Sequence, residues 1–334
     1  MTDSSVPPMT LKRRLRRLYR AVRGAIESGA LALRGGRAVS VQDALRAMPL
    51  MFAEKTYNTA HPDYEPELAR CYAGRIHNSD CRSSNPLFLD LQRRARRGHV
   101  PNRTWQRILR EAMADASQVP GFDQVMRRKA HVENYLAELG QRYRAQFVAG
   151  WVNLVDAQFL YWLVRGTKPK IIVQTGVSNG LSSAFMMLAL AKNGPDGRLY
   201  VIDLPHIFNV ADAEWTRPGK LHGVVIPEGK SSGWLVPDIY RDRLFIEVGD
   251  AKVLLPPLVD RLDAIDLFFH DSDHSYNHMM FEFEQAMRKL SPNAVVVADD
   301  ISWNTSLWDF ADQHGLPGYN FRATMGVAFL PGAG

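Results

Sequence analysis

The chain has 334 residues, of which 46% are hydrophobic and 23% are charged, and its net charge is +6. This is an ordinary globular composition for one large domain or two modest ones. No apolar run approaches the roughly 20 residues that a membrane-spanning helix needs, and the basic N-terminus lacks the apolar core of a signal peptide, so we expect a cytoplasmic protein. Cys71 and Cys81 have no metal-binding spacing and are expected to be free thiols.

Residues 1–25 are predicted to form a basic amphipathic arm. Lys12 and six arginines surround apolar residues that recur at helical spacing. Two interpretations stay open, namely a solvated arm and a helix that contacts an anionic membrane surface. A second basic run lies at Arg93–His99. Neither run has the interleaved aromatic residues typical of single-stranded nucleic-acid binding, so we expect no nucleic-acid partner.

Residues 26–150 are predicted to be a helical N-terminal region without a strand pattern, punctuated by prolines. We expect this region to act as a lid, as part of an acceptor site or as the contact of a homo-oligomer. A strongly apolar helix is expected next, over Val152–Gly166, with glycine as its stop. The helices predicted within the N-terminal region are Val41–Phe52, Asn85–Arg97, Asn102–Ser117 and Asp123–Tyr143.

From Lys170 onward, short apolar strands alternate with helices, so residues 151–334 are expected to form one catalytic domain. Such alternation predicts an α/β fold with a mostly parallel, doubly wound sheet of seven strands. The predicted strands are Lys170–Gly176, Gly197–Pro205, Arg243–Ala251, Ile265–Asp271, Ala294–Asp299, Tyr319–Arg322 and Thr324–Leu330. The predicted helices are Ser182–Gly194, Val253–Arg261, Tyr276–Leu290 and Leu307–His314.

A glycine turn follows the first of these strands. Gly176 allows a tight turn, and Gly180 permits a ligand or a helix to approach closely. The dinucleotide-binding pattern G-x-G-x-x-G would need glycine at position 178, where the chain has Ser178. No Gly-Lys-Ser/Thr follows the turn either, which excludes a nucleotide phosphate loop there.

Two aspartates follow the next two strands. Asp203 lies about one β-α-β unit after the glycine turn, where an acid suits the hydroxyls of a ribose. Asp250 follows the strand after that, where a carboxylate can accept a hydrogen bond from the exocyclic amine of an adenine; a helix cap is the alternative. Together with the glycine turn they indicate an adenosine-containing ligand without a pyrophosphate.

Acidic residues also end the two strands that follow. Asp271, Asp273 and His274 come after one strand, and Asp299 and Asp300 come after the other. In an open α/β sheet, ligands bind outside the carboxyl ends of the strands, so these side chains are expected to share one crevice. Carboxylates held this close are costly unless a cation lies among them, and a hard divalent metal ion explains them best.

These residues together resemble the class I S-adenosylmethionine (SAM)-dependent methyltransferases. The closest resemblance is to the metal-dependent O-methyltransferases related to catechol O-methyltransferase, including bacterial sugar and macrolide enzymes. It covers roughly Trp151–Leu330 and is carried by the segments His270–Tyr276, Ala298–Asn304 and Gly233–Ala251. The resemblance implies a Rossmann-like fold and transfer of a methyl group from SAM to a hydroxyl of a sugar, glycoside or phenolic natural product.

The resemblance also implies roles for single residues. It places Asp271, Asp299 and Asp300 around Mg²⁺ or Mn²⁺, and it makes His274, three residues after the first ligand, the general base. The family usually has glutamate where this chain has Gln174, and the catechol enzymes have asparagine in place of Asp300. The residues implied to contact the cofactor are Gln174, Gly176, Ser178, Gly180, Ser182, Asp203, Asp250 and Asp271.

Several alternatives stay open. The three metal-site acids could cap loops or pair with basic side chains. Asp273 could orient His274, cap the following helix or bind the metal, and His274 could hydrogen-bond instead of acting as a base. His270 is expected to pack on the other face of the sheet. At the level of function, the alternatives are a metal-dependent hydrolase or hydroxylase on the same scaffold and a non-catalytic cofactor-binding protein.

Overall fold

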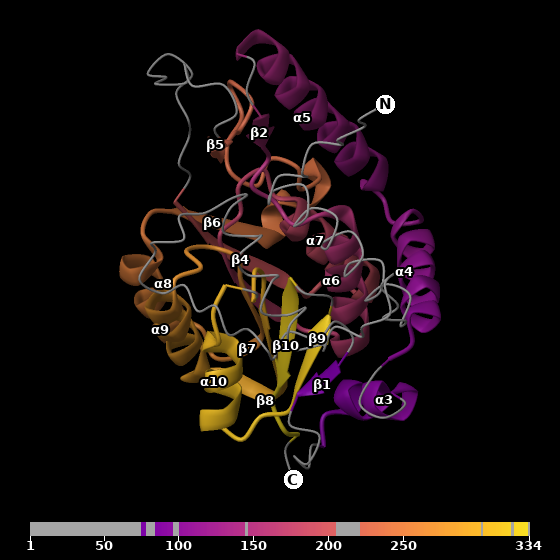
Figure 1. Ribbon diagram of the computed structural model, residues 1–334, viewed down its shortest axis with the longest axis vertical. Coiled ribbons are helices and arrows are strands. Elements are labelled where there is room, and N and C mark those ends of the chain that lie inside the picture. Colours follow the sequence, from indigo (N-terminus) through magenta and orange to yellow (C-terminus); the bar gives the residue numbers. More distant parts are fainter. Residues whose placement is uncertain are drawn as a thin grey trace, which may run out of the picture.

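The computed structural model describes residues 75–77, 84–95, 100–143, 146–204, 221–301, 303–321 and 324–332 (Figure 1). The basic arm 1–25 and the predicted helix Val41–Phe52 lie outside the described residues. No helix in the described part of the chain is long and apolar enough to cross a membrane.

The described residues build one large sheet, whose strand order is β1-β9-β10-β8-β7-β3-β4-β6. Five neighbouring strands are parallel, namely β8, β7, β3, β4 and β6. Strand β10 lies between β8 and β9 and runs antiparallel to both. This confirms the predicted seven-stranded, mostly parallel fold, to which β1 adds an eighth, antiparallel strand at the β9 edge. The strands are β1 (Arg75–His77), β3 (Ile171–Thr175), β4 (Arg198–Asp203), β6 (Leu244–Val248), β7 (Ile265–His270), β8 (Leu290–Ala298), β9 (Gly318–Phe321) and β10 (Met325–Phe329).

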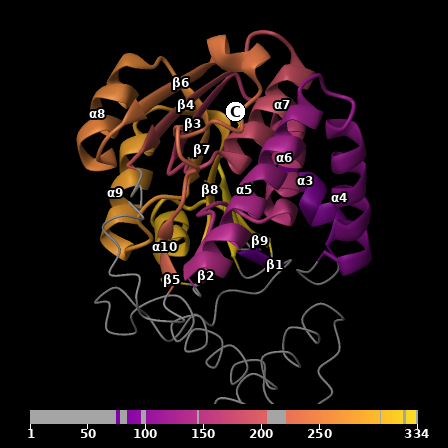
Figure 2. The same ribbon diagram turned by 90° about the horizontal axis from the view of Figure 1, so that it is seen from above.

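Helices cover both faces of this sheet (Figure 2). The central strands are mostly apolar because neighbouring residues pack into opposite layers. In β7, for example, Leu267 and Phe269 belong to one core and Phe268 to the other. One layer holds α3 (Pro86–Arg94), α4 (Asn102–Ala116), α6 (Leu154–Thr167) and α7 (Leu181–Asn193), and the other holds α8 (Ala251–Arg261), α9 (Tyr276–Met287) and α10 (Ser306–Gln313).

The N-terminal helices share a core with the sheet. Phe88 of α3 is fully buried against Phe329 of β10, with ring centroids 5.3 Å apart. Trp105 of α4 is buried among aromatic rings and donates a hydrogen bond of 2.5 Å from its Nε1 to the hydroxyl of Tyr319. Gly166 does not stop α6: the helix continues to Thr167, and Lys168 supplies the left-handed cap with φ 50°.

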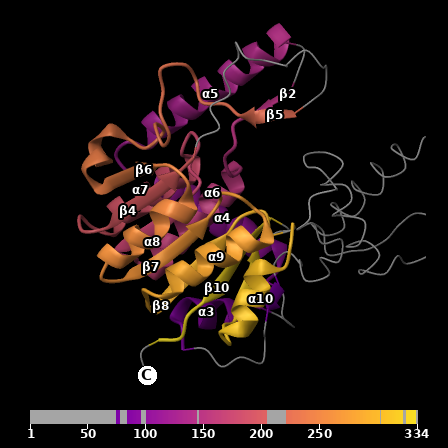
Figure 3. The same ribbon diagram turned by 90° about the vertical axis from the view of Figure 1, so that its left-hand side faces the viewer.

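The prediction that residues 26–150 contain no strand was wrong. Besides β1, the strand β2 (Gln146–Val148) pairs in parallel with β5 (Leu221–Val224) in a separate two-stranded sheet. Strands of three or four residues have too few positions to produce a periodic pattern, so partners distant in the sequence decide them. This small sheet lies beside the long helix α5 (Phe122–Tyr143), away from the main sheet (Figure 3).

Candidate active site

The glycine turn lies between β3 and α7, and both of its glycines are required by their surroundings. Gly176 and Gly180 have φ values of +75° and +91°, a region that side chains disfavour. A Cβ atom on Gly176 would lie 1.9 Å from the carbonyl oxygen of Asp271, and one on Gly180 would lie 2.6 Å from the Cα of Gly233. The turn is therefore pressed against the end of β7 on one side and against the Gly233 loop on the other.

Asn179 fixes the turn from outside. Its side chain is fully buried, and its Nδ2 donates to the carbonyl oxygens of Ala149 (3.1 Å) and Val225 (2.9 Å). Its Oδ1 accepts a 2.8 Å hydrogen bond from Nε1 of Trp234. Ala149 and Val225 directly follow β2 and β5, so these hydrogen bonds connect the small sheet to the glycine turn.

Gln174 and Ser182 brace the turn from inside. Gln174 is fully buried, and its Nε2 donates to the carbonyl oxygen of Gly176 (2.7 Å) and to Oγ of Ser182 (2.9 Å). Its Oε1 accepts a 2.7 Å hydrogen bond from Ser183. All polar atoms of this amide thus have partners within the turn and the start of α7.

Asp203 and Asp250 lie at adjacent strand ends, on the expected side of the turn. Asp203 is almost buried, and its Oδ1 accepts hydrogen bonds from the backbone N–H groups of Val177 (2.9 Å) and Ser178 (3.4 Å), while its Oδ2 accepts one from Ser232. Asp250 is exposed and caps α8, accepting a 2.8 Å hydrogen bond from the N–H of Lys252. Both acids therefore have structural partners, and their contacts with a ribose and an adenine remain predictions.

The backbone joins the glycine turn to the predicted metal ligands. The N–H of Asp271 donates to the carbonyl oxygen of Thr175 (2.9 Å), and the N–H of Asp299 donates to that of His270 (3.0 Å). The ends of β3, β7 and β8 are therefore held side by side, and Asp271, Asp299 and Asp300 meet there. Asp300 adopts a left-handed backbone with φ 50°, which aspartate tolerates better than most residues.

Burial and mutual repulsion dominate the electrostatics of these acids. Burial raises the pKa of Asp271 well above its usual range, and the charges of Asp300, Asp203 and Asp156 add to the shift. The pKa of Asp299 is raised in the same way, by burial and then by Asp300, Asp271 and Asp156.

A hard divalent cation would fit this group by chemistry and by charge. It would offset the mutual repulsion of the carboxylates, and the buried Oδ1 of Asp299 has no hydrogen-bond partner among the described residues. The oxygens are not gathered around a common point, since the described part of the chain contains no group of three or more His, Cys, Asp or Glu side chains arranged to hold a metal ion.

His274 lies at the edge of the acids. Its side chain is 14% exposed, and its Nε2 is 3.6 Å from Oδ2 of Asp300. Burial lowers the pKa of His274 to about 4, against the opposing charge of Asp300, so the imidazole is neutral at physiological pH. Asp273 points elsewhere: its Oδ1 accepts a 2.9 Å hydrogen bond from the N–H of Ser275 at the start of α9, and its Oδ2 is 4.0 Å from Nδ1 of His278.

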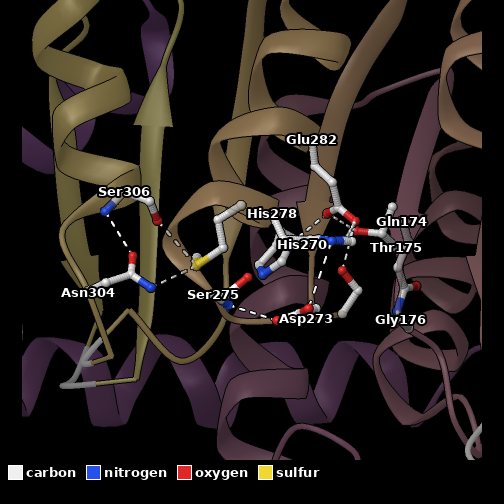
Figure 4. Close-up of polar contacts among 12 residues, drawn as sticks. Gln174, Thr175, Gly176, His270, Asp273, Ser275, His278, Glu282, Asn304 and Ser306 are labelled. Carbon is white, nitrogen blue, oxygen red and sulfur yellow. Dashed lines mark hydrogen bonds and ion pairs between the residues drawn. The ribbon is translucent and has the colours of Figure 1, made fainter. Parts of the chain in front are cut away.

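Sequence reasoning missed two buried acids. Asp156, in the first turn of α6, is 1% exposed and lies within hydrogen-bonding distance of Thr324 (3.5 Å), whose carbonyl oxygen accepts from the N–H of Ile301. Glu282 of α9 is fully buried and binds His270 and His278 (Figure 4). His278 and Glu282 are four residues apart, and that spacing in a helix was the available signal. His270 is buried, as expected, but in a polar contact.

A family model decides what this fold is. Residues 173–301 match the model of a methyltransferase domain. This part of the chain is a methyltransferase domain. The match begins in β3 and ends directly after Asp300, so the methyltransferase domain includes the glycine turn, His274, Asp271, Asp299 and Asp300. No curated protein sequence matches the chain.

Solved structures resemble the chain at low identity. An O-methyltransferase from Bacillus cereus in complex with SAH is 15% identical, with 62% of this chain and 90% of that chain covered and a TM-score of 0.42. The O-methyltransferase TomG from Streptomyces achromogenes, involved in tomaymycin synthesis and in complex with SAM, is 19% identical, with coverages of 68% and 99% and a TM-score of 0.41. A methyltransferase from Geobacter sulfurreducens is 16% identical, with coverages of 60% and 88% and a TM-score of 0.38.

Proposed function

We propose that this methyltransferase domain transfers the methyl group of SAM to a hydroxyl of a small polyhydroxylated acceptor, such as a sugar, a glycoside or a phenol, with the help of Mg²⁺. One observation carries the proposal. A neutral imidazole and a group of carboxylates with raised pKa lie at the same strand ends as a glycine turn that lacks the dinucleotide pattern. Perturbed pKa values that cluster at a ligand-binding edge are typical of catalytic sites.

The cofactor would lie along the glycine turn. A SAM molecule has an adenosine and an amino acid end but no pyrophosphate, so it needs a close backbone approach and hydrogen-bond acceptors for its ribose and adenine. Gly176 and Gly180 give the turn its left-handed backbone, and Asp203 and Asp250 follow the next two strands of the sheet. Asp203 already accepts hydrogen bonds from Val177, Ser178 and Ser232, so one of its four lone pairs would be left to accept a ribose hydroxyl.

Asp271, Asp299 and Asp300 would hold the metal ion. When bound, Mg²⁺ would lower the pKa of an acceptor hydroxyl and orient its oxygen toward the methyl group. The protein's own part is the proton transfer. Nε2 of His274 faces Asp300 at 3.6 Å, so it is the atom that would accept the proton from a hydroxyl bound beside the acids. Because its pKa is low, the imidazole of His274 is unprotonated at neutral pH, as a general base must be.

The N-terminal region would shape the acceptor side of the site. The ends of β2 and β5 bind Asn179 of the glycine turn, and Arg128 of α5 donates from Nη1 to the carbonyl oxygens of Trp234 (2.7 Å) and Val236 (2.9 Å). These contacts place α5 and the small sheet next to the cofactor turn, which supports a role as a wall or lid more directly than a role as an oligomer contact.

Calorimetry with S-adenosylhomocysteine and with NAD tests the cofactor first. We expect binding of the former only, and tight NAD binding without an adenosylhomocysteine signal would contradict the proposal. A screen of sugars, glycosides and catechols with labelled SAM, with and without chelator, then identifies the acceptor by mass gain. Cofactor binding without any transfer would favour a non-catalytic protein, and turnover of a compound without methyl transfer would favour a hydrolase or hydroxylase.

A further inference from the structure

Glu282 is a buried carboxylate near the site that the proposed chemistry does not use. It lies in the middle of α9, is fully buried, and faces the ends of β3 and β7 (Figure 4). The proposed function uses Glu282 neither to bind SAM nor to bind the metal ion. A buried charge is costly and is often replaced by an apolar side chain without loss of stability. Its presence therefore calls for a reason beyond the stability of the core.

Four side chains surround this carboxylate, and each contact is short. Its Oε2 accepts a 2.5 Å hydrogen bond from Oγ1 of Thr175 and lies 2.6 Å from Nδ1 of His270. Its Oε1 accepts a 2.8 Å hydrogen bond from Oγ of Ser272 and lies 2.8 Å from Nε2 of His278. We call these five residues the Glu282 network. Both oxygens are thus fully used, which a carboxylate needs when it is buried.

The partners of Glu282 are neighbours of the site residues along the chain. Thr175 directly precedes Gly176, and His270 and Ser272 lie on either side of Asp271. One carboxylate therefore fixes the residue before the glycine turn and both residues around the first metal-site acid. The fit between these parts is tight, because a Cβ on Gly176 would lie 1.9 Å from the carbonyl oxygen of Asp271. A small shift of β7 against β3 would displace the cofactor turn and Asp271 together.

We infer that Glu282 is a positioning residue, whose carboxylate sets the cofactor turn and Asp271 in their relative places through two separate branches. The cofactor branch runs through Thr175 to Gly176. The metal branch runs through His270 and Ser272 to Asp271. This inference rests on the proposed function, because it assigns the two branches to SAM and to the divalent cation.

Single substitutions separate the two branches in the full-length protein. Thr175→Val removes the donor of the cofactor branch at constant shape, and Ser272→Ala removes one donor of the metal branch. We expect Thr175→Val to weaken the binding of S-adenosylhomocysteine, measured by calorimetry, and to leave Mn²⁺ binding, measured by electron paramagnetic resonance, near the wild-type value. Ser272→Ala should do the reverse, since losing a contact that holds a metal ligand in place typically changes metal affinity about 10–100-fold.

Glu282→Gln should weaken both affinities, because an amide cannot accept hydrogen bonds from all four partners. Glu284→Gln is the matched control: it removes a carboxylate from the same helix, but one that is partly exposed and pairs with His314 at 3.0 Å. It should leave both affinities unchanged. A purely structural role predicts a lower melting temperature for Glu282→Gln with both affinities intact in the folded protein, and that result would overturn the inference.

If Glu282→Gln does not fold, Thr175→Val and Ser272→Ala decide the matter, and wild-type affinities in both would overturn the inference. A wild-type protein that binds neither S-adenosylhomocysteine nor Mn²⁺ contradicts the proposed function instead. A wild-type protein that binds only S-adenosylhomocysteine contradicts the metal part of that function, and Thr175→Val then tests Glu282 through the cofactor branch alone.

Discussion

The two groups of acids near the ends of β7 and β8 differ in how many hydrogen-bond donors surround them. Glu282 has four donor side chains around it. Burial raises its pKa, but His270 and His278 lower the pKa by more than burial raises it, so Glu282 remains ionised. The acid cluster, which consists of Asp156, Asp271, Asp299 and Asp300, faces other carboxylates, and burial and repulsion raise the pKa of Asp271 and Asp299.

This difference indicates different roles for Glu282 and for the acid cluster. A buried carboxylate surrounded by donors already has its counter-charge and serves as an anchor. Carboxylates that face one another lack such a counter-charge, so a bound cation would stabilise them. We therefore expect Glu282 to position its neighbours and the acid cluster to bind a cation. Each prediction below tests one of these two roles.

The largest effect is expected from Asp299→Asn. This change removes one charge from the acid cluster and should lower metal-supported methyl transfer about 10³-fold, because a bound cation contributes several kcal/mol to the reaction. Turnover with labelled SAM over a series of Mg²⁺ concentrations measures it. Asp260→Asn, which removes an exposed partner of Arg288, is the control and should be active. Full activity of Asp299→Asn in excess chelator would mean that the acids are structural.

His274→Ala should lower turnover about 100-fold, since general base catalysis typically contributes that much or more, and should leave cofactor affinity unchanged. Because burial lowers the pKa of His274 to about 4, the wild-type rate should rise with pH only below about pH 5 and be flat through neutral pH. The variant should regain activity as the pH rises, when hydroxide can replace the base. An alanine variant with the wild-type rate and pH profile would remove His274 from the mechanism.

The two groups of acids should also differ in how pH affects stability. A carboxyl group with a raised folded pKa stabilises the fold fully below its unfolded value of about 4, and that stability is lost as the pH rises through the folded value. Without divalent cations, the melting temperature should therefore fall as the pH rises above about 4, and Asp299→Asn should flatten this decline. Glu282, whose folded pKa is lowered, contributes nothing to the decline, because its stabilisation is lost only in strong acid. Parallel curves for wild type and Asp299→Asn would contradict the assignment.

The smallest effect is expected at Asp250, which has one structural contact and one predicted functional contact. Asp250→Asn keeps an acceptor for the N–H of Lys252 and should retain the melting temperature while weakening S-adenosylhomocysteine binding a few-fold. Asp250→Ala should lower both. If the asparagine variant binds the cofactor as tightly as wild type, Asp250 is a helix cap and does not need its charge for the adenine.

The sequence by itself determined the alternation of strands and helices and the acids at the strand ends. Strands buried on both faces are mostly apolar, so the acidic residue after each one is conspicuous, and parallel strands bring those residues to one edge. For the same reason the glycine turn, Asp271 and Asp299 were found without a structure.

Only the tertiary structure decided the rest. Glu282 and Asp156 come from helices, where one polar residue on an apolar face carries no mark of what it meets across the core. The strands β1 and β2 are too short to have a pattern of their own and exist through their partners β9 and β5. The low pKa of His274 likewise results from burial by side chains distant in the sequence, and its local neighbours Asp271 and Asp273 would have suggested the opposite shift.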